Sequence, residues 1–390
     1  MIALGKKFTL LLLCIPPVTM TALLSPAMAS ICEDFPQYSN AVVTLLLTVP
    51  SLSIILGLAA GPLLLKRFSA KYLTMTGMLL FLISSMAPAW CNNFWVIFVC
   101  RAITGIGCGM VIPLQETYIA TYPEKERTEL FGWNVSLGCL IAAVLVVFAG
   151  HLAEIDWHLL FYLYGVNAVV LLSVGVFLPN HAQAEAESIE TKAENYTQCK
   201  LSNYIGLLLM YYILLFACYI CSTGVGAQIS HYVIDCGFGS SVESGILISI
   251  NMVGCLVAGL IFGKYLRIFK NFAMPMLFVC STIGFLLLGI AQSLLTATIG
   301  VFLIGMTGSI IVSIVNYNLS FALPLELFTS ACTGTYFMVY GIQFFGPILY
   351  ALLLNGVMQG SFRLTFLLYA VIQVAFIAVA YVLPKVLIKK

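Results

Sequence analysis

Charged residues are the scarcest class in this chain. Only 8% of its 390 residues are Asp, Glu, Lys or Arg, whereas 62% are hydrophobic and the mean hydropathy is +1.06. A soluble domain carries about 25% charged residues. This chain has too few charges to cover the surface of a water-soluble protein of 390 residues, so lipid must be its main solvent. The net charge of +2 is too small to indicate a nucleic-acid partner.

Side chains for catalysis are sparse as well. No G-x-x-x-x-G-K-[ST] loop occurs, which excludes an ATP-binding motor of that type. The glycines from Gly105 to Gly109 lie within an apolar run and are not a nucleotide loop. We expect all four histidines in loops, where they cannot serve an intramembrane metal site or protease: His151, His158, His181 and His231. The sequence therefore predicts no enzyme, catalytic residue, metal or cofactor.

The 13 cysteines are scattered. Cys218 and Cys221 form a C-x-x-C, but within an apolar segment, where cysteine behaves as a small hydrophobic residue. Cys32, Cys91 and Cys236 are expected in external loops, and a disulfide between two of them is left open.

Long apolar runs dominate the sequence, and a membrane-spanning helix needs about 20 such residues. We predict twelve spans, at about 9–31, 41–65, 72–90, 94–120, 131–150, 159–178, 203–227, 242–263, 272–292, 297–322, 331–354 and 363–384. The acidic, hydrophilic segment 179–202 interrupts them and is predicted to be a cytoplasmic linker. The expected fold is an all-α integral membrane protein of two six-helix bundles, 1–178 and 203–390.

The first thirty residues allow two interpretations. Lys6 and Lys7, an apolar run and Ala27-Met28-Ala29 are typical of a cleaved secretory signal. The alternative is a first membrane helix broken by Pro16, Pro17 and Pro26. We favour the helix because the repeat described below needs a first span.

Basic residues indicate the orientation. With the amino terminus in the cytoplasm, all Lys and Arg of the loops and ends fall inside, and only Arg101 and Arg363 lie at or within helices. External loops carry acids such as Asp34, Asp156 and Asp235. The sequence therefore predicts that both termini are cytoplasmic.

The two halves repeat each other in sequence. The run Asp156–Tyr164 enters the sixth span, and Ser361–Tyr369 enters the twelfth with Phe and Tyr at the same offsets. Pro123 and Pro324 follow the fourth and tenth spans. Parallel repeats about an axis along the membrane normal are a known transporter plan.

These features resemble the major facilitator superfamily over essentially the whole chain. The sharpest element is the run Arg101–Gly109, which fits the family's R-x-x-x-G-x-x-x-G pattern and is followed by Pro113. The Trp157…Phe161 entry to the sixth span is also typical of that family. The resemblance implies a compact 12-helix transporter of bacterial type.

Two departures from the family pattern bear on mechanism. The loop from Gly61 to Lys71 keeps the basic residues Lys66, Arg67 and Lys71 but lacks the usual aspartate, so cytoplasmic closure must use other contacts. The fifth span, at Gly138–Ala142, lacks the proline of the antiporter signature G-P-x-x-G, which weakens the case for a proton-exchanging exporter.

Ionisable residues in lipid are costly and are functional candidates. Arg101 and Glu116 lie within the fourth span, on one helical stripe with Gly105, Gly109 and Pro113. The glycines should allow close helix approach. Arg101 either attracts an anionic group at a cavity or bonds carbonyls of a neighbouring helix. Glu116 is either a proton carrier or a solvated interfacial residue, and about 22 Å along the helix separates the two charges.

Uncharged polar residues form a second candidate set. In the family, spans one, four, seven and ten line the central cavity. We predict that several of these residues touch substrate, the alternative for each being a helix-to-helix hydrogen bond: Thr19, Tyr212, Tyr219, Asn251, Asn316, Asn318 and Gln343.

The leading functional hypothesis is a secondary transporter that moves a small organic solute by alternating access, as a monomer in a bacterial inner membrane. Its expected partners are the solute, membrane lipid and H+ as coupling ion, with export as the first hypothesis. The alternatives are an uptake symporter or uniporter in which Arg101 binds an organic anion, and a non-transporting receptor or scaffold on a transporter fold.

Overall fold

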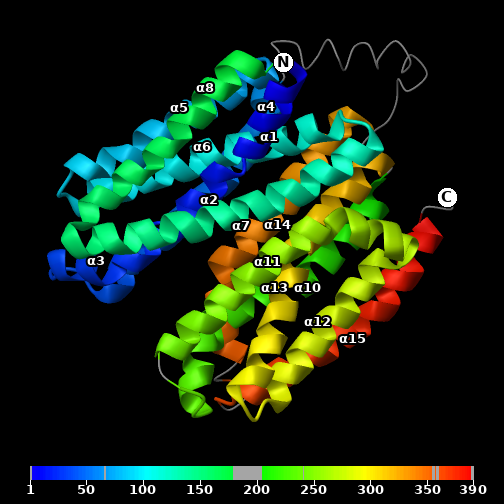
Figure 1. Cartoon of the computed structure of the whole chain (residues 1–390). Helices are drawn as coiled ribbons and strands as arrows, with labels where there is room; N and C mark the ends of the chain where they lie inside the picture. The colour runs from blue at the N-terminus through cyan, green and yellow to red at the C-terminus, as the bar shows by residue number, and fades with distance from the viewer. Residues whose placement is uncertain are drawn as a thin grey trace, which may run out of the picture. The chain divides into compact units, whose positions relative to one another are not determined.

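The structure is a computed structural model that describes residues 2–65, 67–178, 204–239, 241–353, 356 and 360–387. Within those ranges the chain is helical and contains no strand (Figure 1). The first half contains α1 (Ile2–Leu12), α2 (Ile15–Ala22), η1 (Ser25–Ala27), α3 (Met28–Asp34), α4 (Asn40–Leu65), α5 (Ala70–Met86), η2 (Ala87–Trp90), α6 (Phe94–Ala120), α7 (Glu124–Ile155), η3 (Trp157–Gly165) and α8 (Val166–Phe177). The second half contains α10 (Ile205–Asp235), α11 (Ser241–Phe269), η5 (Lys270–Phe272), α12 (Ala273–Ile290), α13 (Leu294–Ala322), α14 (Leu325–Leu352) and α15 (Phe362–Leu387).

Each predicted apolar range that the structure describes is occupied by helix. Ten stretches of the described chain are long and apolar enough to cross a membrane. One of them, Glu243–Ile290, contains two helices, α11 and α12. The all-α membrane class is therefore confirmed. The predicted linker 179–202 and Lys66 lie outside the described residues.

The helices gather into two compact units. Unit 1 comprises described residues of Met1–Pro123, Leu140–Cys199 and Leu323–Tyr340, and unit 2 those of Glu124–Cys139, Lys200–Ala322 and Gly341–Lys390. Helices α7 and α14 each contribute one part to each unit. The units thus interleave along the sequence. The division into bundles 1–178 and 203–390 stays a prediction.

Helix pairing inside the two units follows the same order. In unit 1, α6 packs on α4 and α5, and α8 packs on α5 and α1 (Figure 1). In unit 2, α13 packs on α11 and α12, and α15 packs on α12 and α10. The sequence repeat therefore has a counterpart in the packing.

Glycines permit the closest of these contacts. A Cβ on Gly107 would lie 2.7 Å from the carbonyl oxygen of Gly77, where α6 meets α5. A Cβ on Gly300 would lie 2.8 Å from the carbonyl oxygen of Gly284, where α13 meets α12. Small residues at such crossings let backbones approach, which is a main source of helix association in lipid.

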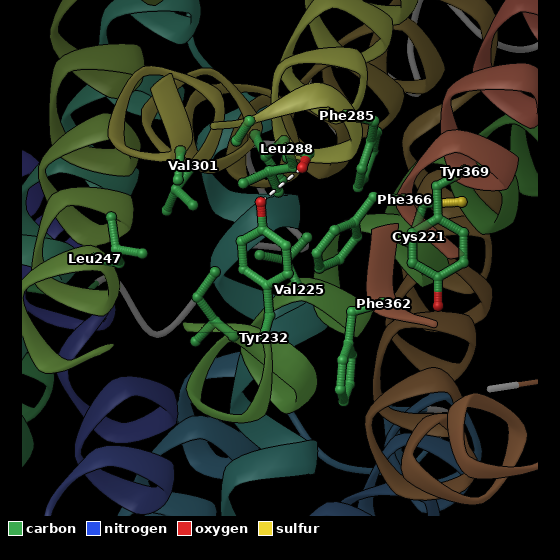
Figure 2. Close-up of a cluster of buried hydrophobic side chains, with 14 of the residues drawn as sticks. Cys221, Val225, Tyr232, Leu247, Phe285, Leu288, Val301, Phe362, Phe366 and Tyr369 are labelled. Atoms are coloured by element: carbon green, nitrogen blue, oxygen red, sulfur yellow. Dashed lines mark hydrogen bonds between the residues drawn. The ribbon is translucent and has the colours of Figure 1, made fainter. Parts of the chain in front are cut away.

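Aromatic side chains fill the interior of unit 2 between α10, α12 and α15. The Tyr232 hydroxyl donates to the Leu288 carbonyl at 2.6 Å, and its ring meets Phe366 edge-on at 5.0 Å (Figure 2). Phe285 and Tyr369 make a similar edge contact at 5.5 Å. A buried phenol is stable here because a backbone carbonyl accepts a hydrogen bond from its hydroxyl.

The first span is a broken helix. Three prolines lack the amide that would bond to the preceding turn, and α1, α2, η1 and α3 succeed one another across residues 2–34. The Cys14 amide bonds to Leu11 instead of Leu10. Carbonyls left over at these breaks, including those of Leu10 and Met20, face donors on α6.

The prediction that the histidines lie in loops was wrong for the three that the structure describes. His231 lies within α10 and His151 within α7, because both helices extend past the apolar runs by one or two turns, and His158 lies in η3. His181 lies outside the described residues. In the part of the chain that the structure describes, no cluster of ligand residues fits a metal ion.

The twelve cysteines that the structure describes are free thiols. Cys218 and Cys221 are buried in the interior of unit 2, as expected for apolar residues. Cys32, Cys91 and Cys236 are partly buried and unpaired.

Asp156 caps η3, and we predict a small pH-dependent stability contribution. Its carboxylate accepts from the His158 amide at 2.9 Å and contacts His158 Nδ1 at 2.8 Å. These bonds, the amide first, hold the pKa of Asp156 below its usual value. A lowered folded pKa gives stability that is present above the unfolded pKa of about 3.9 and lost as pH falls through the folded pKa. Since the side chain is half exposed, a few tenths of a kcal/mol are expected.

The measurement is thermal unfolding of Asp156→Ala beside the wild type. The difference in Tm should be present at pH 7 and narrow below pH 4 or so. A difference independent of pH would contradict the role of the carboxylate.

Candidate functional site

Arg101 lies fully buried in unit 1, in the first third of α6, with 0% of its surface exposed. Its Nε donates to the Leu46 carbonyl at 3.1 Å, and Nη2 donates to the Met20 carbonyl at 2.8 Å. Nη1 donates to the Tyr164 hydroxyl at 3.0 Å. One guanidinium thereby joins α6 to α4, α2 and η3.

The sequence explains why these carbonyls accept. The helical partner of the Leu46 carbonyl would be the amide of residue 50, but Pro50 has none. Met20 precedes the end of α2 at Ala22. Each acceptor is therefore a backbone oxygen left without its helical donor, and in lipid such oxygens must be satisfied from within the protein.

A second donor on α6 works in the same way. The Gln115 side chain donates to the Leu10 carbonyl at 2.8 Å. Nearby, Thr19 bonds its own helix at Ile15, and Asn167 donates to the Tyr164 carbonyl at 3.0 Å and reaches the Thr19 hydroxyl at 3.4 Å. Thr19 is 1% exposed, so it lies in an internal network of unit 1. Gln115, Asn167 and Tyr164 were not among the predicted site residues. The one local signal in the sequence is Pro50, which leaves the Leu46 carbonyl free to accept from Arg101.

Glu116 lies near the carboxyl end of α6 and is 3% exposed. Its Oε1 accepts from the Tyr336 hydroxyl of α14 at 2.5 Å. One residue further, Thr117 and Thr329 join their hydroxyls at 2.9 Å. The first 16 residues of α14, which belong to unit 1, thus bring a phenol to a buried carboxyl group. Tyr336 was not a predicted site residue, and no sequence pattern indicated it.

A polar pair joins α10 and α14 in unit 2. The Gln343 Nε2 donates to the Tyr219 hydroxyl at 2.8 Å. One turn along α10, Thr223 bonds the Tyr350 hydroxyl, which also donates to the Ile220 carbonyl at 2.7 Å. Two of the predicted substrate residues, Tyr219 and Gln343, therefore lie in direct contact.

The remaining polar candidates occupy separate places. Asn251 on α11 is half buried and donates to the Val301 carbonyl at 3.1 Å. Asn316 on α13 is fully buried, and neither atom of its amide has a hydrogen-bond partner among the described residues. Tyr212 is half buried on α10. Asn318 on α13 contacts the side chain of Tyr211, the residue before Tyr212 on α10.

The packing residues lie at helix crossings and helix ends. A Cβ on Gly105 would lie 2.3 Å from the Pro50 carbonyl oxygen, and one on Gly109 2.3 Å from that of Ile54, so both glycines face α4. Pro113 is buried inside α6. Lys71 donates to the Gly175 carbonyl at 2.8 Å in the last turn of α8, where a cation is favoured, while Arg67 is exposed.

Curated relatives match parts of the chain. The 4-hydroxybenzoate transporter PcaK of Pseudomonas aeruginosa is 31% identical over 135 residues, 32% of this chain and 29% of that protein. The multidrug efflux pump SdrM of Staphylococcus aureus is 24% identical over 183 residues, 44% of this chain and 39% of that protein. The matched segments thus span well under half of these relatives.

A solved structure matches the whole fold. The proton:xylose symporter XylE aligns with a TM-score of 0.74 at 17% identity, covering 96% of this chain and 94% of that one. At this identity the likeness shows the fold alone. The model of the Major Facilitator Superfamily matches residues 10–347. The chain therefore belongs to the Major Facilitator Superfamily and is a multi-pass membrane protein.

Proposed function

We propose that the protein is a secondary transporter that exports a small organic solute by alternating access, with protons as the coupling ion. Membership of the superfamily and the repeated helix packing of the two units support alternating access. The similarity of a 183-residue segment to a multidrug efflux pump supports export. The proposed setting is a bacterial inner membrane with both termini in the cytoplasm.

Glu116 carries the proton-coupling proposal. It is a buried carboxyl group within a membrane-spanning helix, and its Oε1 accepts from the hydroxyl of a phenol, Tyr336. An ionisable group in lipid is retained at a cost of several kcal/mol, which a proton-carrying role explains. Because α6 and α14 are joined through this bond, a change in the charge of Glu116 would alter the contact between them.

Uptake of an organic anion is the second candidate. It is favoured by the 31% identical segment of the 4-hydroxybenzoate transporter. In that hypothesis Arg101 would bind the anion, but its guanidinium is enclosed and bonded to two carbonyls and a hydroxyl. We therefore place export first and assign Arg101 a structural role.

We predict that Glu116→Gln uncouples transport from the proton gradient. A glutamine keeps the shape and an acceptor for Tyr336 but cannot bind or release a proton. In proteoliposomes loaded with the strongest ligand of a thermal-shift screen, flux driven by a pH gradient should be lost, while counterflow exchange should persist within about twofold, because exchange needs no net proton movement.

The matched control is Glu129→Gln, which removes an exposed carboxylate of α7 and should leave both fluxes unchanged. Gradient-driven flux through Glu116→Gln at the wild-type rate would remove Glu116 from the coupling role. If no compound is transported under any condition by a folded protein, the receptor hypothesis takes the place of transport.

A further inference from the structure

Polar side chains lie half buried near the middle of two helices of unit 2. Tyr219 and Thr223 occupy the central turns of α10, and Gln343 lies in the second half of α14. They are linked by the Gln343–Tyr219 and Thr223–Tyr350 bonds. We refer to Tyr219, Thr223, Gln343 and Tyr350 as the hydroxyl–amide cluster.

Their partial exposure has a meaning in a membrane protein. A polar group facing hydrocarbon loses its hydrogen bonds to water without compensation, so polar side chains at mid-span face the protein interior or a water-filled path. Tyr219, Thr223 and Gln343 keep part of their surface uncovered at this depth, while Tyr350 is buried beside them. Substrates of such transporters bind near mid-span.

The cluster retains bonding capacity of both kinds. A glutamine amide has two N–H donors and a carbonyl acceptor, and the bond to Tyr219 uses one donor. The Tyr219 hydroxyl accepts that bond and has its own proton to donate. A ligand that both donates and accepts, such as an alcohol or an amide, complements this pattern.

Charge is absent from the same region. The charged side chains that the structure describes on α10, α11 and α15 all lie within about two turns of a helix end. They are Asp235, Glu243, Lys264, Arg267 and Arg363. In unit 1 the buried cation Arg101 is 0% exposed and already bonded. No described group at mid-span is thus placed to neutralise an anion, and transferring a bare charge into such surroundings is costly.

We infer that the hydroxyl–amide cluster is a substrate subsite for an uncharged molecule bearing hydroxyl or amide groups. This inference rests on the proposed transport function and narrows its substrate class. It selects against the organic anions of the uptake hypothesis.

The test compares two carbon skeletons in three charge states. The probes are 4-hydroxybenzyl alcohol, 4-hydroxybenzylamine and 4-hydroxybenzoate, together with glucose, glucosamine and gluconate. Binding to the purified full-length protein is measured by thermal shift and calorimetry at pH 7, and flux is measured in proteoliposomes. At least one neutral probe should bind about tenfold or more tightly than its charged counterparts.

Variants assign the effect to the cluster. Tyr219→Phe and Gln343→Leu should each weaken binding of the neutral probe about tenfold, the value of one lost hydrogen bond to a ligand. Gln343→Glu, which is isosteric but acidic, should weaken it as well, and Gln343→Asn covers the case that Gln343→Leu fails to fold. Gln373→Leu removes another amide of unit 2, which bonds the Ala217 carbonyl, and should leave affinity unchanged.

The outcomes separate the two proposals. Stronger binding of a carboxylate or an amine, binding of neither neutral probe, or unchanged affinity in all the cluster variants would overturn the inference. Flux of any of the six probes would still support transport. Conversely, selective binding of a neutral probe without flux would retain the subsite and reject the transporter assignment.

Discussion

Replacing Arg101 by leucine should destabilise the protein by about 3 to 6 kcal/mol, since three hydrogen bonds from a charged donor are lost at about 1 to 2 kcal/mol each. The carbonyls of Leu46 and Met20 would remain buried without a donor. Total stability is only about 5 to 15 kcal/mol, so most of the variant should fail to fold. The readout is the yield of monodisperse protein in detergent and its Tm.

The geometry also specifies a partial rescue. Pro50→Ala restores an amide at position 50, which can bond the Leu46 carbonyl within α4. Arg101→Leu combined with Pro50→Ala should therefore recover about 1 kcal/mol relative to Arg101→Leu alone. Arg67→Leu removes an exposed arginine and should leave Tm nearly unchanged. A fully stable Arg101→Leu protein would return Arg101 to the substrate-binding hypothesis.

The second large effect concerns two glycines of α4 that lie one turn apart. A Cβ on Gly57 would lie 2.2 Å from the Ile106 carbonyl oxygen and 3.0 Å from the Gly109 Cα, whereas a Cβ on Gly61 meets no atom within 4 Å. Gly57→Ala must push α4 away from α6 because backbone atoms are in the way, and we expect a loss of about 2 to 4 kcal/mol. Gly61→Ala should be neutral or stabilise by up to about 1 kcal/mol through helix propensity.

Both variants carry the same glycine-to-alanine substitution in the same helix, so each serves as the control for the other. Both are compared by Tm in the same detergent and by the fraction folded in membranes. Equal losses at the two positions would show that α4 and α6 are not in contact through Gly57.

The fold was predictable because its main determinant is local. A run of about 20 apolar residues demands a helix in lipid, and each predicted run that the structure describes is helical. The family pattern around Arg101 and the Asp156–Tyr164 and Ser361–Tyr369 repeat identified the superfamily. Helix ends were less predictable, as His231 shows, because α10 continues past its apolar part.

The partners of the polar residues were not predictable. Sequence spacing placed Arg101 and Glu116 on one stripe of α6, but whether each meets a ligand or the backbone depends on neighbouring helices. The Glu116–Tyr336 contact joins residues 220 positions apart. The acceptor at Leu46 alone had a local signal, since Pro50 removes the amide that would bond it.

The broken first span has a consequence for biogenesis. Its Leu10 and Met20 carbonyls receive donors that lie 105 and 81 residues further along the chain. When this span leaves the ribosome, those donors have not been synthesised, and hydrocarbon offers no substitute. We expect the nascent segment to stay beside the translocon, or in contact with its water-filled channel, until α6 emerges. The first span would then enter the lipid fully only when the fourth span, α6, supplies the missing hydrogen-bond donors.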